Sequence, residues 1–152
     1  MDLYPTTQIH PITTSHEVAL PMVSEQTVRN QFAIWETDNP IPFFDDLPEN
    51  ITFKVCGSLN PLRGTYTSRD QVLETFGKLS SRFAGPFRTT ITSVLVSGEY
   101  GIVEGVMRNV SKGGFHFEQE ICWISRYEGD VIVEVRLYVD SAAEKAVMEE
   151  AE

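Results

Sequence analysis

Four strand-like runs follow one another between residues 87 and 140, and this stretch constrains the fold more than any other. The runs are rich in β-branched and aromatic residues, and turns containing glycine separate them. This pattern predicts an antiparallel meander over residues 87–97, 101–110, 115–127 and 131–139. The runs are longer than the usual 5–6 residues or so, which favours a bent sheet. Gly105, inside the second run, is a candidate bulge or bend.

Alternation along the last two runs predicts the two faces of this sheet, because successive side chains on a strand point to opposite sides. One face is almost wholly apolar and holds a single amide, Gln119; its members are Phe115, Phe117, Gln119, Ile121, Trp123, Val131, Val133, Val135, Leu137 and Val139. The opposite face is mixed and charged, with a row formed by His116, Glu118 and Glu120. The apolar face needs a cover, and we expect the chain before residue 87 to supply it.

Composition limits the classes of function. A chain of 152 residues with 41% apolar residues fits one soluble globular domain with a sizeable core. A formal net charge of −10 argues against nucleic acid or an anionic membrane as a partner. No apolar run approaches the ~20 residues of a membrane span, and no secretory signal is visible. We therefore expect a cytoplasmic protein in which Cys56 and Cys122 are reduced.

Helix signals occupy the chain before the meander. Ser24 is a candidate N-cap, and Val28, Phe32 and Trp35 follow on one helical face. A second short helix is expected at residues 41–47 and a strand at 51–56, followed by a loop at 57–64. A capping box at residues 68–71 opens the clearest helix, which ends at Gly85 and Pro86.

The ends of the chain differ from its middle. Residues 1–22 lack periodicity, so we interpret them as an arm without regular structure. A capping box at residues 141–144 opens a short acidic helix that we expect to pack loosely. The expected organisation is an arm at 1–22, one domain at 23–145 and an acidic tail at 146–152. Within that domain, helices collect on one side of a curved antiparallel sheet, an α+β arrangement in which three helices cover a cone with an internal cavity.

Three motifs in this order resemble the SnoaL-like family of the nuclear-transport-factor-2-like superfamily. They are the entry into the third helix at residues 60–72, the Gly-x-x-Phe-x-Gln-x-Ile-Cys-Trp strand at 114–123 and the closing strand at 129–140. The resemblance covers about residues 24–145 and implies the cone fold. Members of this family include polyketide cyclases, ketosteroid isomerases, epoxide hydrolases, dehydratases and non-catalytic modules, so the fold alone does not give the function.

The acid/base residues that the resemblance implies do not carry over. The segment that holds the general base of the ketosteroid isomerases is Phe53-Lys-Val-Cys-Gly57 here, without a carboxylate. Their tyrosine on the first helix falls near Gln31 or Phe32. In the final strand, Leu137 occupies the position of the epoxide hydrolases' acid. Any catalysis therefore needs another set of residues.

Three residues are the candidates for that set. Gln119, the amide on the apolar face, could donate to a ligand oxygen or could form an internal hydrogen bond. Tyr66 could donate a hydrogen bond at the mouth of the cone or pack at its rim. Glu104 would be a base with a raised pKa if its side of the strand faces inward, and a surface or dimer-face charge if it faces outward.

The expected ligand-binding residues would give a cavity suited to a flat apolar molecule, and they are Trp35, Phe53, Arg63, Met107, Phe117, Trp123 and Leu137. The alternative for the aromatic residues is core packing, and the alternative for Arg63 is an exposed loop charge. The row at His116, Glu118 and Glu120 could hold a metal, but a dimer surface is the favoured interpretation, since no further ligand converges on it. We expect no metal and no cofactor.

Two functional hypotheses follow. The first is a cofactor-independent isomerase or cyclase acting on an apolar polyketide or terpenoid intermediate of secondary metabolism, by proton abstraction and oxyanion stabilisation. The second is a non-catalytic dimeric module of the same fold that binds a ligand or a partner. Both predict a homodimer through the outer face of the sheet. They differ in whether a carboxylate faces an open cavity.

Overall fold

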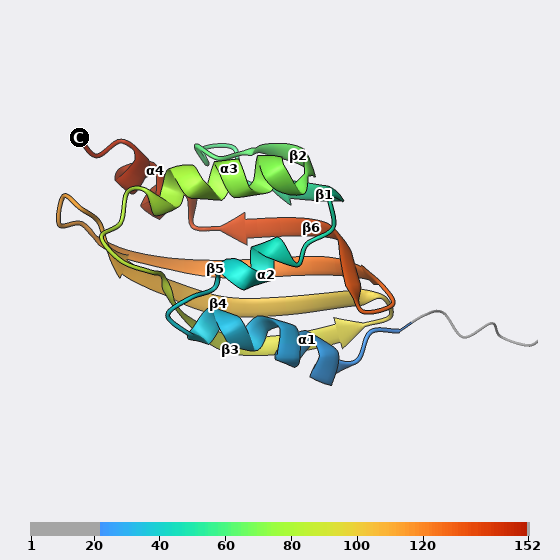
Figure 1. Ribbon diagram of the computed structural model, residues 1–152. Coiled ribbons are helices and arrows are strands. Elements are labelled where there is room, and N and C mark those ends of the chain that lie inside the picture. Colours follow the sequence, from blue (N-terminus) through green and yellow to red (C-terminus); the bar gives the residue numbers. More distant parts are fainter. Residues whose placement is uncertain (1–21, 152) are drawn as a thin grey trace, which may run out of the picture.

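A computed structural model describes residues 22–151, which form a curled, unclosed sheet with helices across its concave side (Figure 1). The predicted arm lies outside the described residues, apart from Met22. The helices are α1 (Glu25–Phe32), the 3₁₀ helix η1 (Ala33–Glu36), α2 (Ile41–Asp45), α3 (Arg69–Ser80) and α4 (Ser141–Met148). The strands are β1 (Asn50–Val55), β2 (Gly64–Ser68), β3 (Arg88–Ser97), β4 (Tyr100–Val110), β5 (His116–Glu128) and β6 (Val131–Val139).

The six strands lie in the order β2-β1-β6-β5-β4-β3. The predicted meander is confirmed, because β3 to β6 pair antiparallel in sequence order. The α+β class is confirmed as well. The prediction of a wholly antiparallel sheet is wrong at one pair, because β1 runs parallel to β6. Alternation in residues 51–56 indicates a strand but carries no information about its long-range partner. The short strand β2 was not predicted.

Two of the register shifts in the sheet lie within the meander. Between Ile91 and Ser93 of β3 the register shifts opposite Gly105 of β4, so the bulge lies in the strand beside the glycine. A Cβ atom at Gly105 would lie 2.8 Å from the carbonyl oxygen of Thr90, so a side chain there would collide with the backbone. A second shift, between Arg126 and Tyr127, changes the side to which the start of β6 points.

The second shift corrects the predicted faces of β6. Ile132 pairs with the buried Tyr127 and is itself buried, whereas Val131 is 49% exposed. The prediction that Val131 and Val133 share the inner face with Val135 is therefore wrong. Beyond the shift the alternation is as expected, and Val135 and Leu137 are buried. A one-residue slip reverses every later side chain, and the local sequence does not mark where it occurs.

Side-chain caps begin the helices at the expected places. The hydroxyl of Ser24 accepts a hydrogen bond from the backbone N–H of Thr27 at 3.0 Å, and that of Ser68 accepts from Gln71 at 3.2 Å. The C-terminal helix differs from the prediction, because Asp140 is its N-cap and accepts from Ala142 at 3.0 Å. Its neighbour Ser141 is the first helical residue, so the helix begins one residue earlier than predicted.

The core is dominated by aromatic rings between the helices and the concave face. Trp123 of β5, which is fully buried, stands at the centre. Its ring centroid lies 5.0–6.4 Å from those of five other residues, Phe32, Trp35, Phe43, Phe44 and Phe53. Such pairs contribute about 0.5–1.5 kcal/mol each beyond burial of their surface. This cluster anchors α1, η1 and α2 on the sheet and fills one end of the cone.

The C-terminal helix α4 packs tightly, contrary to the loose packing that we expected. Val147 is fully buried and Glu144 is 2% exposed. The end of the helix is also held, because the hydroxyl of Ser111 donates to a carboxylate oxygen of Glu150 at 2.8 Å and Arg82 donates to the Glu150 carbonyl at 3.1 Å. The helix therefore closes the cone at the end away from the aromatic cluster.

Candidate ligand cavity and its buried carboxyl

A cavity of about 310 Å³ lies between the helices and the concave face. Its volume is at the small end of the range for small-molecule sites, about 300–1,000 Å³. Most of the lining is apolar and comes from the sheet, η1, α2 and α3: Trp35, Pro40, Ile41, Phe44, Leu73, Phe76, Gly77, Leu79, Phe87, Met107, Ile121, Trp123, Leu137 and Val139. Four further residues bring polar side chains: Ser80, Thr89, Gln119 and Glu144.

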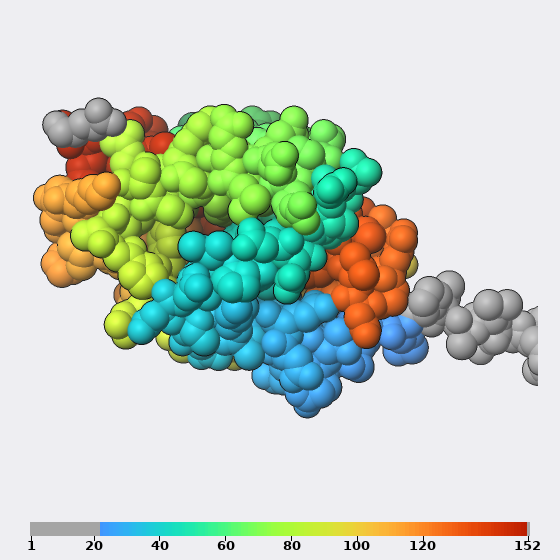
Figure 2. Space-filling model, viewed as in Figure 1, coloured from blue at the N-terminus to red at the C-terminus, as the bar shows by residue number. Residues whose placement is uncertain are grey.

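The cavity is open to solvent beside α2 and α3. Figure 2 shows a hollow between the cyan surface of α2 and the green surface of α3. Ile41 of α2 is 61% exposed, and Gly77 of α3 is exposed as well. Both residues line the cavity, so the opening lies between these two helices. A ligand can enter there without displacing the sheet.

Among residues 22–151, Glu144 of α4 is the one ionisable residue that lines the cavity. Burial raises the pKa of its carboxyl above the ordinary value of 4.5, because the charged form loses its water. The nearby Asp140 carboxylate raises this pKa further, whereas the neighbouring amides of Gln119 and Asn60 lower it. Burial has the largest effect. A carboxyl with a raised pKa inside a cleft is the pattern expected of a group that exchanges protons.

The residues around Glu144 connect α4 to the sheet but leave one of its carboxyl oxygens without a hydrogen bond. Gln119 donates through Nε2 to the carbonyl oxygen of Asp140 at 3.0 Å, which ties β5 to the start of α4. Asn60 accepts from the backbone N–H of Leu62 at 2.8 Å, and its Nδ2 is buried without a hydrogen-bond partner. The Oε2 atom of Glu144 is also buried without one. Buried polar groups usually have partners, and of these two atoms only Oε2 of Glu144 belongs to a residue that lines the cavity.

A second unpartnered polar group lies at the other end. Trp35 of η1 is 5% exposed and lines the cavity, and its indole Nε1 has no hydrogen-bond partner. Trp123, which also lines the cavity, differs because its Nε1 donates to the hydroxyl of Ser125 at 2.7 Å. Trp35 packs against Trp123, four residues along β5 from Gln119. At about 3.4 Å per residue, the Gln119 and Trp123 positions are roughly 14 Å apart along the strand.

The structure brings together five of the ten residues named from the sequence. Trp35, Met107, Gln119, Trp123 and Leu137 all line the cavity. Phe53 and Phe117 are buried in the core behind the lining, against Phe76 and Phe83 respectively. They shape the cavity without facing it. For these two residues the alternative interpretation, core packing, describes their positions.

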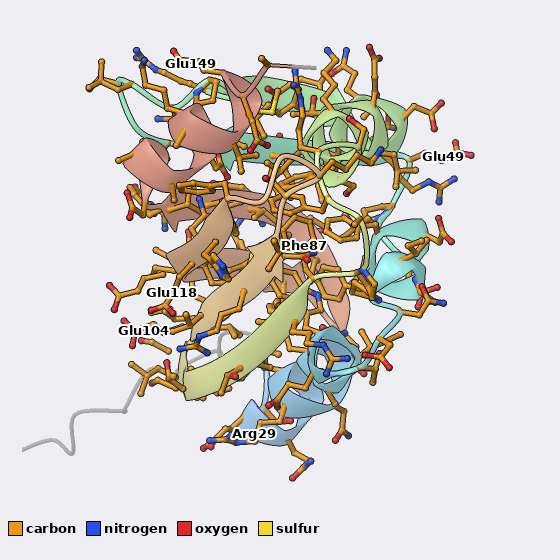
Figure 3. All side chains as sticks on the ribbon, turned by 90° about the vertical axis from the view of Figure 1, so that its left-hand side faces the viewer. Arg29, Glu49, Phe87, Glu104, Glu118 and Glu149 are labelled. Carbon is orange, nitrogen blue, oxygen red and sulfur yellow. The ribbon has the colours of Figure 1, made fainter. Side chains whose placement is uncertain are left out.

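Three of the ten lie away from the cavity. Glu104 is exposed on the convex face, and Figure 3 shows it beside Glu118 on the side of the sheet away from α2. Its position excludes the predicted role as a base in the cavity. Tyr66 donates its hydroxyl to the carbonyl oxygen of Leu62 at 2.5 Å, so it packs over its own loop. Arg63 is exposed on that loop.

Glu144 is a candidate site residue that the sequence patterns did not predict. The sequence pattern predicts Glu144 as the last residue of a capping box that Ser141 opens. Because Asp140 caps the helix instead, Glu144 is free to turn toward the sheet. The available signal was its position four residues after Asp140 and three before Val147, on the helical face that is buried. Like Gln119 on its apolar strand face, a lone acidic residue on a buried helical face is a candidate for a side chain that enters the cavity.

The convex face carries charges that pair within the chain. Arg108 donates to Glu118 at 2.9 Å and Arg126 donates to Glu134 at 3.1 Å. Cys56 and Cys122 are free thiols, as expected. In the part of the chain that the structure describes, no three His, Cys, Asp or Glu residues are grouped to hold a metal ion. Within residues 22–151, no helix is long and apolar enough to cross a membrane.

Comparisons with known proteins place this architecture among solved folds. No protein-family model matches the sequence, and no curated protein does. An NTF2-like protein from Burkholderia thailandensis superposes with a TM-score of 0.68 at 20% identity, covering 83% of this chain and 97% of that one. A protein from Catenulispora acidiphila with a ketosteroid isomerase-like fold, in complex with trimethylamine, has a TM-score of 0.64 at 18% identity over 85% and 96% of the two chains.

A third solved structure, assigned as a SnoaL-like polyketide cyclase from a Jannaschia species, has a TM-score of 0.65 at 12% identity over 84% and 92% of the two chains. Identities this low show the fold alone. The chain therefore has the NTF2-like fold shared by ketosteroid isomerase-like and SnoaL-like proteins, as the three sequence motifs predicted. Activity has to be argued from the cavity itself.

Proposed function

We propose that this protein is a cofactor-independent enzyme of the isomerase or cyclase type, in which Glu144 transfers a proton to and from a neutral, largely apolar carbonyl compound. Polyketide and terpenoid intermediates of secondary metabolism belong to this chemical class, and we propose a cytoplasmic location for the reaction. The observation that carries the proposal is a single buried carboxyl with a raised pKa in an open apolar cavity.

The chemistry needs only one acid/base group. The Glu144 carboxylate takes a proton from a carbon next to the carbonyl, and the C–H electron pair becomes the enolate. The protonated Glu144 then returns the proton to another carbon, which gives an isomer, or to the oxygen formed when the enolate attacks a second carbonyl, which gives a ring. Both routes balance without an oxidant or a metal. Gln119 and Asn60 act as positioning residues, since their amides neighbour the carboxyl.

The composition of the lining supports a neutral substrate. No Lys, Arg or His lines the cavity in the part of the chain that the structure describes, so none of these residues would compensate an anionic group. Six aromatic rings, from Trp35, Phe44, Phe76, Phe87 and Trp123 and from Phe83 behind them, favour a flat apolar body. Ser80 adds no free donor, because its hydroxyl already donates to the carbonyl oxygen of Phe76 at 2.9 Å.

Exchange of α-protons tests the proposal without knowledge of the natural substrate. We would follow loss of the C1 protons of 2-tetralone in D₂O by proton NMR, with the wild-type protein, Glu144→Gln and Glu104→Gln. General-base catalysis contributes about 10²- to 10⁴-fold, so Glu144→Gln should lose a factor in that range. Glu104→Gln, which removes a carboxylate from the other face, should stay within about 2-fold of wild type.

The pH dependence provides an independent readout. The reacting form is the carboxylate, so the rate should rise with pH as Glu144 ionises, and the midpoint should lie above 4.5 because burial raises the pKa. A wild-type rate equal to that of Glu144→Gln at every pH would contradict the proposed enzyme.

The second candidate is a binding module of the same fold without turnover. One observation favours it. Gln119, the amide that the sequence predicts as a donor to a ligand oxygen, already donates to the carbonyl oxygen of Asp140. In that case 2-tetralone would bind but would not exchange its protons faster than in buffer. The exchange experiment therefore separates the two functions.

We also propose a homodimer through the convex face. Support comes from large apolar side chains exposed on the strands, namely Leu95 at 56% and Tyr138 at 47%. Light scattering coupled to gel filtration should give twice the chain mass of 17.1 kDa. A Tyr138→Glu variant should return the protein to the mass of one chain. A wild-type protein that elutes as a single chain at micromolar concentration would exclude the dimer.

A further inference from the structure

The proposed proton transfer at Glu144 does not involve the indole N–H of Trp35. This donor is buried and unpartnered, and its side chain lines the same cavity. Burying an amide-like donor without a partner costs about 1–3 kcal/mol, and the cost is recovered when a ligand accepts the hydrogen bond. The nearest comparison is Trp123, whose N–H is satisfied by Ser125 within the protein.

Position along the sheet separates this donor from the carboxyl. Gln119, next to Glu144, and Trp123, next to Trp35, are four residues apart on β5 and point to the same face. Between them the lining is apolar and comes from Ile121 together with neighbours on the adjacent strands and helices. The cavity is thus polar at two ends and apolar in the middle.

We propose that the ligand is an elongated neutral molecule with oxygen at both ends, whose far oxygen accepts a hydrogen bond from Trp35 while its ketone end lies at Glu144. This inference deepens the proposed function, because it names the substrate class of the same cavity. Trp35 is a binding residue in this arrangement, since it selects and orients the ligand without handling the proton.

The donor character of the indole N–H supports an oxygen acceptor as the far group of the ligand. An indole N–H only donates, so it recognises a carbonyl, ether or hydroxyl oxygen and does not recognise an N–H or an ammonium group. A site built around such a donor discriminates against an analogue that lacks the acceptor, because the donor is then left unpaired. Selection between two ligands of the same shape is therefore the property to measure.

Two probes of matched shape provide the test: 6-methoxy-2-tetralone, with an ether oxygen opposite the ketone, and 6-ethyl-2-tetralone, with a methylene in its place. Affinities would be measured by ligand-observed NMR titration for the wild-type protein and for Trp35→Phe, which keeps an aromatic ring and removes the N–H. The methoxy compound should bind wild type about 5-fold more tightly than the ethyl compound, which corresponds to about 1 kcal/mol. The ratio should fall to about 1 in Trp35→Phe.

The ethyl compound also serves as the control for the variant. Its affinity for Trp35→Phe should stay within about 2-fold of wild type, which shows that the pocket still forms. Equal binding of the two probes to wild type, a ratio that persists in Trp35→Phe, or no binding of either probe would each overturn the inference. Equal binding would mean that the surrounding ring faces accept the N–H.

Proton exchange on the same probes separates this inference from the proposed function. Exchange that depends on Glu144, with equal affinities for the two probes, would leave the enzyme standing and remove the role of Trp35. A Trp35-dependent preference without exchange would leave the two-ended ligand standing and remove the enzyme.

Discussion

Glutamates lie on both sides of the sheet, but in opposite environments. On the convex face Glu104 and Glu118 are exposed to water, and Glu118 pairs with Arg108. On the concave side Glu144 is 2% exposed, has one oxygen without a partner and has its pKa raised by burial. A carboxylate in water is an ordinary surface charge, whereas burial raises the pKa of a carboxyl, so that it holds and exchanges its proton at a higher pH. Environment therefore decides which glutamate can do chemistry.

The largest difference between the faces should appear in stability. Phe53 and Lys54 are neighbours on β1, and the first is fully buried while the second is exposed. Phe53→Ala should lower the free energy of unfolding by about 3–5 kcal/mol, because it opens a hole among aromatic rings. Lys54→Ala should change it by less than about 0.5 kcal/mol. Urea unfolding measures both, and similar losses in the two variants would mean that the concave face is not the core.

A smaller effect tests how closely α1 lies on the sheet. A Cβ atom at Gly101 would lie 2.8 Å from Cγ2 of Val28 and 3.0 Å from Cε2 of Tyr127. Gly101→Ala should therefore cost about 1–3 kcal/mol by overpacking. The control is Gly77→Ala on α3, where the added methyl meets nothing within 4 Å and should stabilise the helix by about 0.5–1 kcal/mol. Thermal unfolding should show opposite signs for the two changes.

The third prediction concerns pH. Because burial raises the pKa of Glu144, the folded protein holds that proton more tightly than the unfolded chain does. Its contribution to the unfolding free energy is then most favourable below pH 4.5, declines as pH rises toward the raised pKa, and is constant above it. Glu144→Gln lacks this decline, so its stability relative to wild type should increase from pH 4 to pH 7.

The exposed Glu104→Gln variant is the control for that experiment, and its difference from wild type should change much less over the same range. Melting temperatures at several pH values provide the measurement. If Glu144→Gln lost stability relative to wild type as the pH rose, the carboxyl would be stabilised by its charge, contrary to the burial argument.

The smallest effect is expected from the surface ion pair. Arg108 and Glu118 lie 2.9 Å apart on adjacent strands, and both are at least half exposed. A double-mutant cycle with alanine at each position should give a coupling energy of no more than about 1 kcal/mol. The coupling should fall at 1 M salt, where screening is strong. A larger, salt-resistant coupling would show that another surface covers this face.

Expectations from the sequence held where the signal is local. The four strands of the meander, their long length and the N-caps at Ser24 and Ser68 are all present, because alternation, turn glycines and capping residues act over a few positions. The expectations were wrong where the structure depends on a strand that is distant in the sequence. The parallel pairing of β1 with β6 and the slip beside Tyr127 depend on strands that are far apart in sequence.

The candidate site divides in the same way. Gln119 and Trp123 were found from strand periodicity, since an alternating pattern fixes which side chains share a face. The spacing of Glu144 from Val147 was a signal in the sequence, but two adjacent residues, Asp140 and Ser141, can both begin the helix, and the capping box assigned Glu144 to its first turn. Only the packed structure shows which of them caps it.

By itself, the sequence determined a curved α+β cone with an apolar inner face and one amide within it. The tertiary structure alone decided which acidic residue enters that cone, because entry depends on how α4 docks across the end of the sheet. Docking is a long-range event in which the caps of the helix, the burial of Val147 and the contacts of Glu150 combine. Residue patterns predict which side chains share a face of a helix or strand, and packing decides which of those faces are in contact.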